Sequence, residues 1–538
     1  MSHKRRPTLM GGLLWTGLGV VFLLNSFRIG PGVRTMVGRY WPILLILLGL
    51  GKVIDYLRQK EGVSLRVGEV FGIFFLLLIG SVLTLISRSH FPIWLRNFPI
   101  DIGERQVPIG DFLGNSYTFS QEAAYHLTSP VPLRIDNAYG NVAVTQGGDR
   151  EIKVRLAKKV YQNEESQARK IADEIRLEGG TDAGIFVVKT NREVLASKDY
   201  RFRTDMEVSI PRKSLIQVRT SYGDIRITNV TGKFDLSTIH RQLDIRDCNG
   251  DVEASNRYGD SRIINLTGNL NIEARGPVYL ETIKGDVAVR NEYSPVEIKS
   301  VEGKVSVSNT ENKIDLEEIS KPVVIDARGG QIVVRNLKES LKITARHSRR
   351  LQVSDVASSV VLNSSYSSPS LKNIKGNVEI DSKSDELALE GLQGFLKIRG
   401  EGSSVRVNTV AGPIDIVTTG KDVVVNDFGG SCKVTNEDGD VKLSTRNRLK
   451  GDVSVKNRRG AIDLFLPDDA SFLVDAAARN GGGAESDFEG IVPVEAAGDI
   501  GMLKGKVNAG GPRIVLETEY NKIRLRKQGS EASKNSGN

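Results

Sequence analysis

The fold is decided by Asp224-Ile-Arg-Ile-Thr228 and by its later counterparts, Val287-Ala-Val-Arg290 and Lys304-Val-Ser-Val-Ser308. In each segment every second residue is small or aliphatic, so alternate side chains share one face of a β-strand. Glycines punctuate these segments at positions 223, 232, 250, 259, 268, 285 and 303, and almost every gap is a multiple of nine. A short, fixed period stacks each strand on its neighbour. The sequence therefore predicts an all-β, single-stranded parallel β-helix, or β-solenoid.

Asparagine supplies a second periodic signal, because strand after strand ends in this residue. Asparagine tolerates left-handed turn geometry, and stacked amides can hydrogen-bond from coil to coil. The gaps of 18 and 27 residues are both multiples of nine, so a coil could hold two strands or three. The repeats then make roughly nine to fourteen coils, a rod some 45–65 Å long. The asparagines are Asn229, Asn256, Asn265, Asn291, Asn309, Asn336, Asn363, Asn408, Asn426 and Asn457.

The charge composition of the sequence limits the chemical classes of partner that are expected. The 538 residues include 74 basic and 65 acidic ones, a net charge of +9, and these charges are interspersed. Such a mildly basic surface favours anionic partners such as phospholipid head groups or acidic cell-wall polymers. Nucleic-acid binding needs a concentrated basic stripe with stacking aromatics, which the sequence lacks, so no nucleic-acid partner is expected.

The two cysteines are too far apart to bridge. Cys248 and Cys432 would be separated by several coils, tens of Å at about 4.8 Å per coil, so both are expected to be free thiols. Cys248 lies in Asp247-Cys-Asn-Gly250, which the sequence predicts to be an exposed turn.

Residues 1–90 predict a transmembrane region. Three apolar stretches, Leu9–Phe27, Tyr40–Tyr56 and Val67–Ile86, are each long enough for a membrane helix. Basic residues are more frequent before the first span and between the second and third, which favours a cytoplasmic N-terminus. Three crossings then place everything after Ser87 outside. We therefore expect a multi-pass protein of the bacterial cytoplasmic (inner) membrane, with the lipid bilayer as a partner and the C-terminal domain extracytoplasmic.

The remaining chain divides by the strength of the β pattern. One amphipathic helix is expected at 163–177, where Ala168, Ile171, Ala172 and Ile175 recur at helical spacing. The expected parts are a juxtamembrane linker at 91–129, an N-terminal capping unit with that helix at 130–215, solenoid repeats at 216–465, a C-terminal cap at 466–526 and a disordered tail at 527–538.

Aspartates that follow glycine are the best candidates for chemistry. If stacked, they could bind Ca²⁺ or divide acid and base roles across a sugar. Gly-Asp is also favourable turn chemistry, and Lys233 and Lys304 interrupt the row, so the structural interpretation is favoured. We therefore assign no catalytic, cofactor-binding or metal-binding residue and expect no cofactor. The aspartates are Asp224, Asp251, Asp260, Asp286, Asp440 and Asp452.

Other polar motifs point to structural roles. Gly505-Lys506 lacks the remainder of a phosphate loop, and Asp427-Phe-Gly429 stands without any other kinase motif. Histidines are scattered without metal-ligand spacing, at His3, His90, His126, His240 and His347. Outward basic residues could form a face for anionic polymers, but solvated charges beside acidic neighbours are the favoured interpretation. They are Arg226, Arg246, Arg290, Arg335, Arg406 and Lys442.

Two resemblances accompany these patterns. The segment Arg39-Tyr-Trp-Pro-Ile-Leu-Leu-Ile-Leu-Leu-Gly49 resembles the LiaF-type transmembrane domain of bacterial proteins linked to cell-wall antibiotic responses. Residues 130–526 resemble the bacterial "putative adhesin" β-solenoid family of unknown function. The features that carry this second resemblance are the early helix, Leu466-Pro-Asp-Asp-Ala-Ser471, and the turns Tyr139-Gly-Asn141, Tyr222-Gly-Asp224 and Tyr258-Gly-Asp260.

The resemblance implies a bacterial envelope protein with a β-helical outer domain and no catalytic residues. Together with the usual hand of crossover connections, it implies a right-handed helix. The expected role is non-enzymatic: binding, adhesin-like attachment or envelope-stress sensing, with envelope proteins or anionic cell-wall polymers as partners. One alternative is a polysaccharide-active lyase or hydrolase, which needs a cleft with paired carboxylates. Another is a polymerising cytoplasmic scaffold, which needs the opposite topology and uncapped ends.

Overall fold

The computed structural model forms two compact units, residues 1–114 and 115–538. It describes residues 115–528 without 128–130, 149, 199, 213 and 496–499, together with a small antiparallel pair in the first unit, β1 (Pro99–Ile102) and β2 (Arg105–Pro108). Within these residues no helix has both the length and the hydropathy needed to cross a bilayer. The three predicted spans, the LiaF-like segment, His3 and His90 lie outside the described residues.

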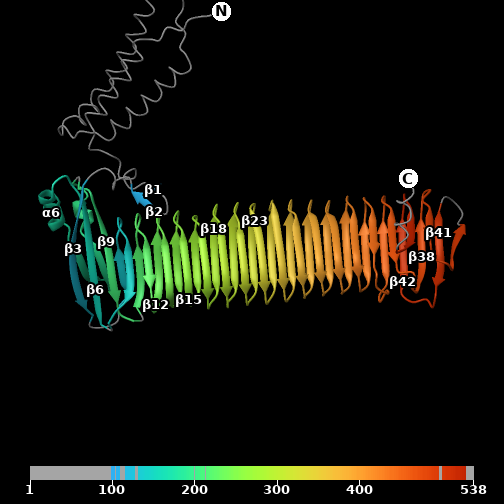
Figure 1. Ribbon diagram of the computed structural model, residues 1–538, viewed down its shortest axis with the longest axis horizontal. Coiled ribbons are helices and arrows are strands. Elements are labelled where there is room, and N and C mark those ends of the chain that lie inside the picture. Colours follow the sequence, from blue (N-terminus) through green and yellow to red (C-terminus); the bar gives the residue numbers. More distant parts are fainter. Residues whose placement is uncertain are drawn as a thin grey trace, which may run out of the picture. The chain divides into compact units, whose positions relative to one another are not determined.

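The second unit is a solenoid of two facing parallel sheets (Figure 1). Each coil gives one strand to each sheet, and the next coil pairs with it 18 residues later, as in Ile216↔Phe234↔Val252. A coil therefore holds two strands. The 27-residue gaps between asparagines arise because Asn229 lies beside sheet II and Asn256 in sheet I, one and a half coils apart. The described residues make about 14 turns, the upper end of the expected range. The right hand of the helix stays a prediction.

Sheet I takes the even-numbered strands of the repeats. They are β10 (Ser214–Arg219), β12 (Gly232–Thr238), β14 (Val252–Asn256), β16 (Leu270–Ala274), β18 (Val287–Glu292), β20 (Val305–Thr310), β22 (Val323–Arg328), β24 (Leu341–Arg346), β26 (Val360–Ser365), β28 (Val378–Lys383), β30 (Leu396–Glu401), β32 (Ile414–Thr419), β34 (Cys432–Asn436) and β36 (Val453–Asn457).

Sheet II takes the odd-numbered strands. They are β11 (Ile225–Thr228), β13 (Leu243–Asn249), β15 (Ser261–Thr267), β17 (Val278–Ile283), β19 (Val296–Val301), β21 (Ile314–Ile319), β23 (Gln331–Leu337), β25 (Arg350–Val356), β27 (Pro369–Ile374), β29 (Glu386–Leu392), β31 (Ser404–Val410), β33 (Val423–Phe428), β35 (Val441–Ser444) and β37 (Ile462–Leu466).

The core lies between the two sheets. Strands such as β14 and β16 alternate buried and exposed residues, so each sheet has one apolar inner face and one solvated outer face. The inward aliphatic side chains form one continuous cluster along the rod. Burial of this cluster provides the main stabilisation, because each coil can bury its apolar face only against its neighbours.

Asparagines belong to two ladders and not to the single aligned ladder that their spacing predicted. In sheet II, a residue in left-handed geometry bends most strands, and at some of these positions it is asparagine, as at Asn265 (φ 55°). Its amide donates to Asp247 Oδ1 of the preceding coil at 2.8 Å. In sheet I, asparagines at the strand ends are buried, and Asn291 Nδ2 donates to the Gly276 carbonyl at 2.8 Å. The first ladder bends the strand and the second satisfies turn carbonyls inside the rod.

The bend in sheet II overturns one expectation. Cys248 does not lie in an exposed turn: it is buried, with 3% of its surface exposed, and it pairs with Leu266 in the next coil. Asp247 adopts left-handed geometry (φ 54°) and resets the alternation, so the next side chain points inward. Val230 occupies the same inward position one coil earlier. Both cysteines are free and buried.

The N-terminal end carries strands inserted outside the first coil. The coil of β4 (Leu133–Asp136) and β5 (Val142–Gln146) pairs directly with β10 and β11. The chain then leaves the rod and returns, so that sheet I ends in β4–β8–β7 and sheet II in β5–β9–β6–β3. The added strands are β3 (Ser116–His126), β6 (Glu151–Tyr161), β7 (Leu177–Asp182), β8 (Ile185–Thr190) and β9 (Phe202–Ile210).

The helix expected at 163–177 forms as α6 (Glu165–Glu174), and its buried Ala168, Ile171 and Ala172 join Val160 of β6 in a small separate core. A second short helix, α7 (Arg192–Leu195), was not predicted from the sequence.

The C-terminal end also carries strands inserted outside the regular repeats. After β37 the chain forms β38 (Phe472–Ala478), β39 (Ala484–Ser486), β40 (Ile491–Glu495) and β41 (Gly501–Val507). It then returns, so that β42 (Arg513–Thr518) lies between β36 and β38, and β43 (Ile523–Lys527) between β37 and β39. The last strands of the chain are therefore internal, and earlier strands cover them.

Candidate binding groove

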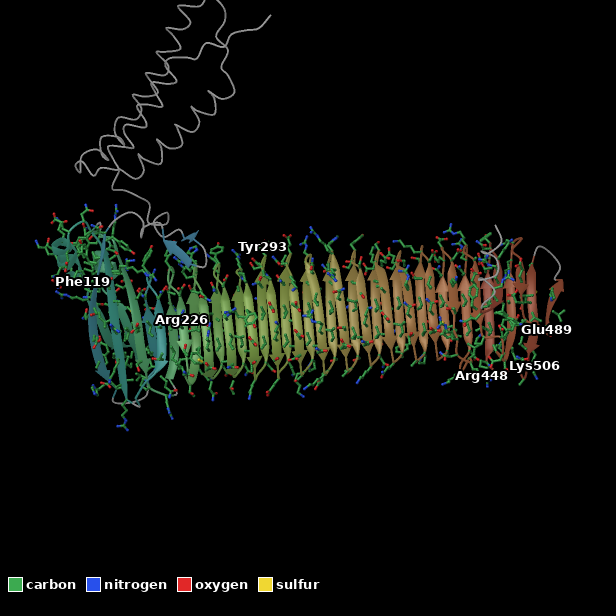
Figure 2. The ribbon with its side chains drawn as sticks, viewed as in Figure 1. Phe119, Arg226, Tyr293, Arg448, Glu489 and Lys506 are labelled. Carbon is green, nitrogen blue, oxygen red and sulfur yellow. The ribbon has the colours of Figure 1, made fainter. Side chains whose placement is uncertain are left out.

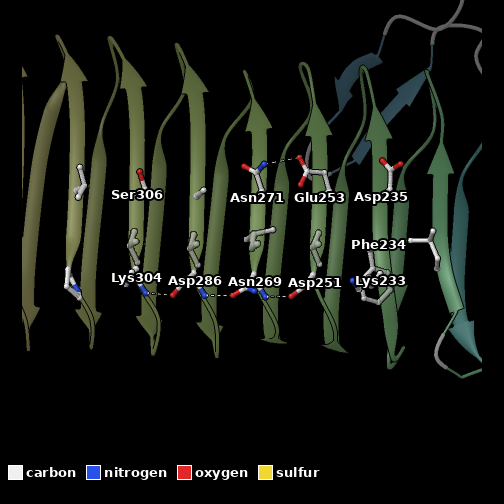
Figure 3. Close-up of a pocket in the computed structure, with 18 residues that line it drawn as sticks. Lys233, Phe234, Asp235, Asp251, Glu253, Asn269, Asn271, Asp286, Lys304 and Ser306 are labelled. Atoms are coloured by element: carbon white, nitrogen blue, oxygen red, sulfur yellow. Dashed lines mark hydrogen bonds between the residues drawn. The ribbon is translucent and has the colours of Figure 1, made fainter.

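A shallow groove of about 670 Å³ crosses the outer face of sheet I from β10 to β22 (Figure 3). Two parallel rows of side chains line it, one at the start of each strand and one two residues further on. It runs along the rod for six coil steps, about 29 Å at about 4.8 Å per step. The first row includes Lys233, Asp251, Asn269, Asp286 and Lys304, and the second Asp235, Glu253, Asn271, Ala288 and Ser306.

Backbone hydrogen bonds fix the first row. The backbone N–H of Asn269 donates to Asp251 Oδ1 at 2.9 Å, that of Asp286 to Asn269 Oδ1 at 2.9 Å, and that of Lys304 to Asp286 Oδ1 at 2.8 Å (Figure 3). Each acidic or amide side chain thus satisfies the first N–H of the following coil, which lies beyond the sheet ladder. The preceding glycines are required because the coils nearly touch. A Cβ on Gly250 would lie 1.6 Å from the Gly232 carbonyl oxygen.

The aspartates predicted to stack do not form a continuous carboxylate row. Asp251 and Asp286 share sheet I with Asn269 between them, and Asp452 bonds to the amide of Arg513. Asp224 and Asp260 lie on the sheet II side with Gln242 between them, and Asp440 bonds to the amide of Ala461. These contacts agree with the turn interpretation of Gly-Asp. Among the described residues, no three His, Cys, Asp or Glu side chains gather where they could hold a metal ion.

The groove is locally acidic over an apolar floor. Four carboxylates, those of Asp235, Asp251, Glu253 and Asp286, line it against two lysines. Asp235 accepts a bond from Gln217 Nε2 at 3.2 Å, and Glu253 from Asn271 Nδ2 at 2.8 Å. The floor of the groove consists of small or apolar side chains. At its two ends, Leu215 and Val324 are 39% and 46% exposed. Polar rows beside an apolar floor suit a ligand with hydroxyl or amine groups and an apolar face.

The predicted basic residues do not gather into one face. Arg290 lies on sheet I and the other five on sheet II, where Arg226 is labelled in Figure 2. Most pair with nearby carboxylates. Arg246 lies 2.8 Å from Asp244, Arg290 3.0 Å from Glu273, and Arg335 2.9 Å from Asp315. Lys442 lies over the Phe465 ring at 4.8 Å. These contacts favour solvated charge pairs over a polyanion-binding surface.

The remaining polar candidates lie apart from the groove. His126, His240 and His347 are exposed and far apart. Gly505-Lys506 lies within the antiparallel strand β41, and Asp427 is a left-handed bend residue (φ 51°). Burial raises the pKa of the Cys432 thiol to about 12 and also raises that of Cys248, so neither is an activated nucleophile.

Two features escaped sequence reasoning. One is the groove itself. The small outward residues Ala288 and Ser306 in neighbouring coils indicate it in the sequence, but they can be recognised as neighbours only once the 18-residue register is known. The other is Asp385, which is 1% exposed, accepts the Ser364 hydroxyl and the Ser367 amide (2.8 Å), and has its pKa raised by burial. This group bridges coils inside a turn.

A family model described as Toastrack DUF4097 matches residues 132–348 and 320–489. No curated protein matches the chain. A solved "putative cell adhesion protein" from Clostridium sporogenes is 8% identical, with a TM-score of 0.13, and the match covers 77% of this chain and all of that one.

Two solved "putative adhesin" structures also match. The one from Bacteroides fragilis is 13% identical, with a TM-score of 0.18, and the match covers 52% of this chain and 97% of that one. The one from Parabacteroides merdae is 9% identical, with a TM-score of 0.20, covering 56% and 97%. Because the family model spans more than half of the sequence over the two-sheet solenoid, this chain belongs to the Toastrack DUF4097 family.

Proposed function

We propose that this chain is a membrane-anchored, non-enzymatic binding protein of the bacterial envelope, whose extracytoplasmic solenoid holds an extended polymer in the sheet I groove. The observation that carries the proposal is the groove's direction. It follows the rod axis across successive coils, and its two rows repeat with every coil. A surface whose side-chain positions repeat suits a repeating ligand, because each added ligand unit meets side chains at the same spacing.

The groove's charge narrows the ligand class. Four carboxylates against two lysines would repel a polyanion, so we propose a neutral or amine-bearing glycan of the cell wall. Anionic cell-wall polymers, phospholipid head groups or envelope proteins would have to bind elsewhere on the rod. An envelope-stress-sensing role would use the same groove, with ligand occupancy as the signal.

An enzymatic role is less well supported. The best-placed carboxylates are Asp235 and Glu253, which lie opposite each other on β12 and β14. Both are on the open outer face and both accept a bond from a neighbouring side-chain amide. Dividing acid and base roles requires two carboxyl groups in different environments, which this pair lacks. A polymerising scaffold is also less well supported, because the edge strands at the C-terminal end are blocked: β39 has only three residues and β40 contains Pro493.

The groove can be tested by filling it. In Ser306→Trp the added indole would occupy the groove, whereas Ser308→Trp places the same side chain on the same strand and face, two residues outside it. Full-length protein in detergent is assayed for sedimentation with purified cell-wall sacculi. Binding should be lost in Ser306→Trp and kept in Ser308→Trp. Equal binding by the two variants, or none by the unmodified protein, would refute the proposed site.

The topology can be tested with a new thiol. Both native thiols are buried, so they give no labelling background in folded protein. Ser308→Cys places one on the exposed face. A membrane-impermeant maleimide should label this variant in whole cells. Labelling only after lysis would place the solenoid in the cytoplasm and favour the scaffold alternative.

A further inference from the structure

The two sheets end in four edge strands, and three of these are poor templates for further pairing. In sheet I, β7 contains Gly179 and Gly180 and two carboxylates, and β40 contains Pro493, which has no N–H to donate. In sheet II, β39 has only three residues. Short strands, charges and prolines are the usual means of blocking edge-to-edge association.

The fourth edge, β3, has fewer of these protections: its only carboxylate is Glu122, and it is neither short nor interrupted by proline. It is 11 residues long, Ser116–His126, without proline, glycine or lysine. It pairs with β6 over its full length without a bulge, from Ser116↔Tyr161 to His126↔Glu151. Among the described residues, no strand pairs with its other edge. A long, regular open edge is a site for strand addition.

The direction of the free backbone groups follows from two bonds that flank β3. The Gln162 amide donates to the Asn115 carbonyl at 3.1 Å, and the Leu127 amide to the Arg150 carbonyl at 2.9 Å. Residues 115 and 127 are therefore hydrogen-bonded positions, and antiparallel pairing makes every second residue between them the same. The N–H and C=O groups of the even-numbered residues 116 to 126 consequently point away from β6.

We propose that β3 pairs antiparallel with β3 of a second copy of this chain, about a two-fold axis at Gln121, to form an end-to-end dimer. In this register each outward-facing residue meets another: Ser116 faces His126 of the partner subunit, and Ser120 faces Glu122 of the partner subunit. The full strand is used and no like charges meet. A shift of two residues in one direction sets the two Glu122 carboxylates against each other, and the opposite shift leaves His126 unpaired.

A second copy fits better than a foreign strand because β3 is complementary to itself. A two-fold contact uses the same patch on both copies and closes after two. The blocked edges β39 and β40 at the other end then prevent growth into a fibre. The dimer does not depend on the groove or its ligand, so either proposal can fail alone.

Disulfide trapping in the full chain tests the axis. In the proposed register the two copies of residue 121 form a non-hydrogen-bonded pair about 4.5 Å apart at Cα, within disulfide range. Mild oxidation should trap Gln121→Cys as a covalent dimer. The matched control, Ser116→Cys, would lie about 34 Å from its counterpart and should stay monomeric. A monomeric Gln121→Cys, as expected if another segment of the chain covers this edge, or equal trapping of both variants, would overturn the proposal.

Two substitutions at one exposed residue test the register. Ser120 lies on the solvated face, so neither change should disturb the fold of one copy. Ser120→Glu sets two Glu–Glu pairs across the interface, and Ser120→Lys sets two Lys–Glu pairs. Analytical ultracentrifugation of the full chain in detergent should give a dimer dissociation constant for Ser120→Glu at least about tenfold above that for Ser120→Lys. Equal constants would overturn the proposed pairing.

Discussion

The two ends of the rod share an inserted topology, but different forces fasten them. At the N-terminal end the Arg192 guanidinium lies between two rings, 4.0 Å from that of Phe202 and 4.9 Å from that of Tyr139. The stack continues from Tyr139 to Tyr222 (4.9 Å), His240 (4.7 Å) and Tyr258 (5.3 Å), one ring per coil. Lys158 Nζ adds a buried cation that donates to two carbonyls at the end of α6.

In addition to the apolar core that it shares with the rest of the rod, the C-terminal end carries charge pairs between neighbouring coils. Arg524 of β43 donates to Asp463 of β37 at 2.7 Å, and Arg526 to Asp487 at 2.7 Å. Lys456 of β36 lies 3.3 Å from Glu517 of β42. Desolvated cation–π contacts are weakly screened by salt, whereas exposed ion pairs are strongly screened. The two ends of one rod can therefore respond differently to the same change of solvent.

The largest expected effect is at Arg192. Arg192→Ala removes a desolvated cation–π contact and the bond to the Phe202 carbonyl (3.0 Å), and should cost the N-terminal end about 3 kcal/mol. Burial lowers the pKa of this guanidinium only to about 10, so it remains charged at neutral pH. Amide hydrogen exchange should report a local loss of protection in β8 and β9, because repeat proteins open region by region.

Arg192→Met is the matched variant. It keeps an apolar side chain between the rings and removes the buried Nε, which has no hydrogen-bond partner. It should therefore lose less protection than Arg192→Ala. Equal loss in the middle coils would show that the stack supports the whole rod and not one end.

The repeat was readable from the sequence, whereas the ends were not. Glycine and asparagine spacing predicted the solenoid because each coil repeats the same local contacts. The spacing could not place β42, because the alternation in Arg513-Ile-Val-Leu-Glu517 is the same as in any coil. Its position between β36 and β38 depends on how the intervening strands fold. Likewise, the exposure of Cys248 was predicted wrongly because the left-handed residue before it, Asp247, shifts the alternation of inward and outward side chains.

The groove could be predicted only in part. The sequence singled out Asp251 and Asp286 as strand-start residues, with Lys304 at the same offset, and both aspartates accept a backbone N–H of the next coil. It did not join them to Asp235 and Glu253, because the two-strand coil was left open against a three-strand one. Only the 18-residue register brings the two rows together on one face.

A smaller effect is expected at the C-terminal ion pair of Asp463 and Arg524. Asp463→Asn keeps the shape but weakens the paired bonds to the guanidinium. Because Arg524 is 42% exposed, we expect a cost of about 1 kcal/mol, near the upper end for such pairs. Hydrogen exchange should increase in β43 and leave β9 unchanged. The matched control is Glu273→Gln, which breaks a similar pair with Arg290 in the middle of the rod.

Salt should separate the two ends without any mutation. Raising ionic strength from about 0.1 to 1 M shortens the Debye length from about 10 to 3 Å. Amides of β42 and β43 should then exchange faster, by less than about tenfold, since each exposed pair contributes little. Amides of β8 should keep their protection, whereas β9 is a poor reference because Arg203–Asp205 and Arg155–Glu207 are ion pairs on it. A uniform response of both ends would contradict the division between stacking and charge.

The smallest effect is a pH dependence confined to the N-terminal stack. Partial desolvation between the rings of Tyr222 and Tyr258, followed by the nearby Arg257 and Arg241, lowers the pKa of the otherwise exposed His240 below its ordinary value near 6.5. Between the two pKa values the unfolded chain binds a proton that the folded chain does not, so stability falls as pH drops through this window. At still lower pH both states are protonated and the loss levels off.

Hydrogen exchange around β11 and β13 should therefore increase as the pH is lowered below about 6.5, after correction for the intrinsic exchange rate. His240→Phe keeps a ring in the stack and has no titrating group, so it should abolish this dependence. His347→Phe changes the separate stack with Tyr366 and should leave it intact. If His240→Phe retains the wild-type profile, the acid sensitivity belongs to carboxylates, and the N-terminal end is more like the C-terminal end than its contacts indicate.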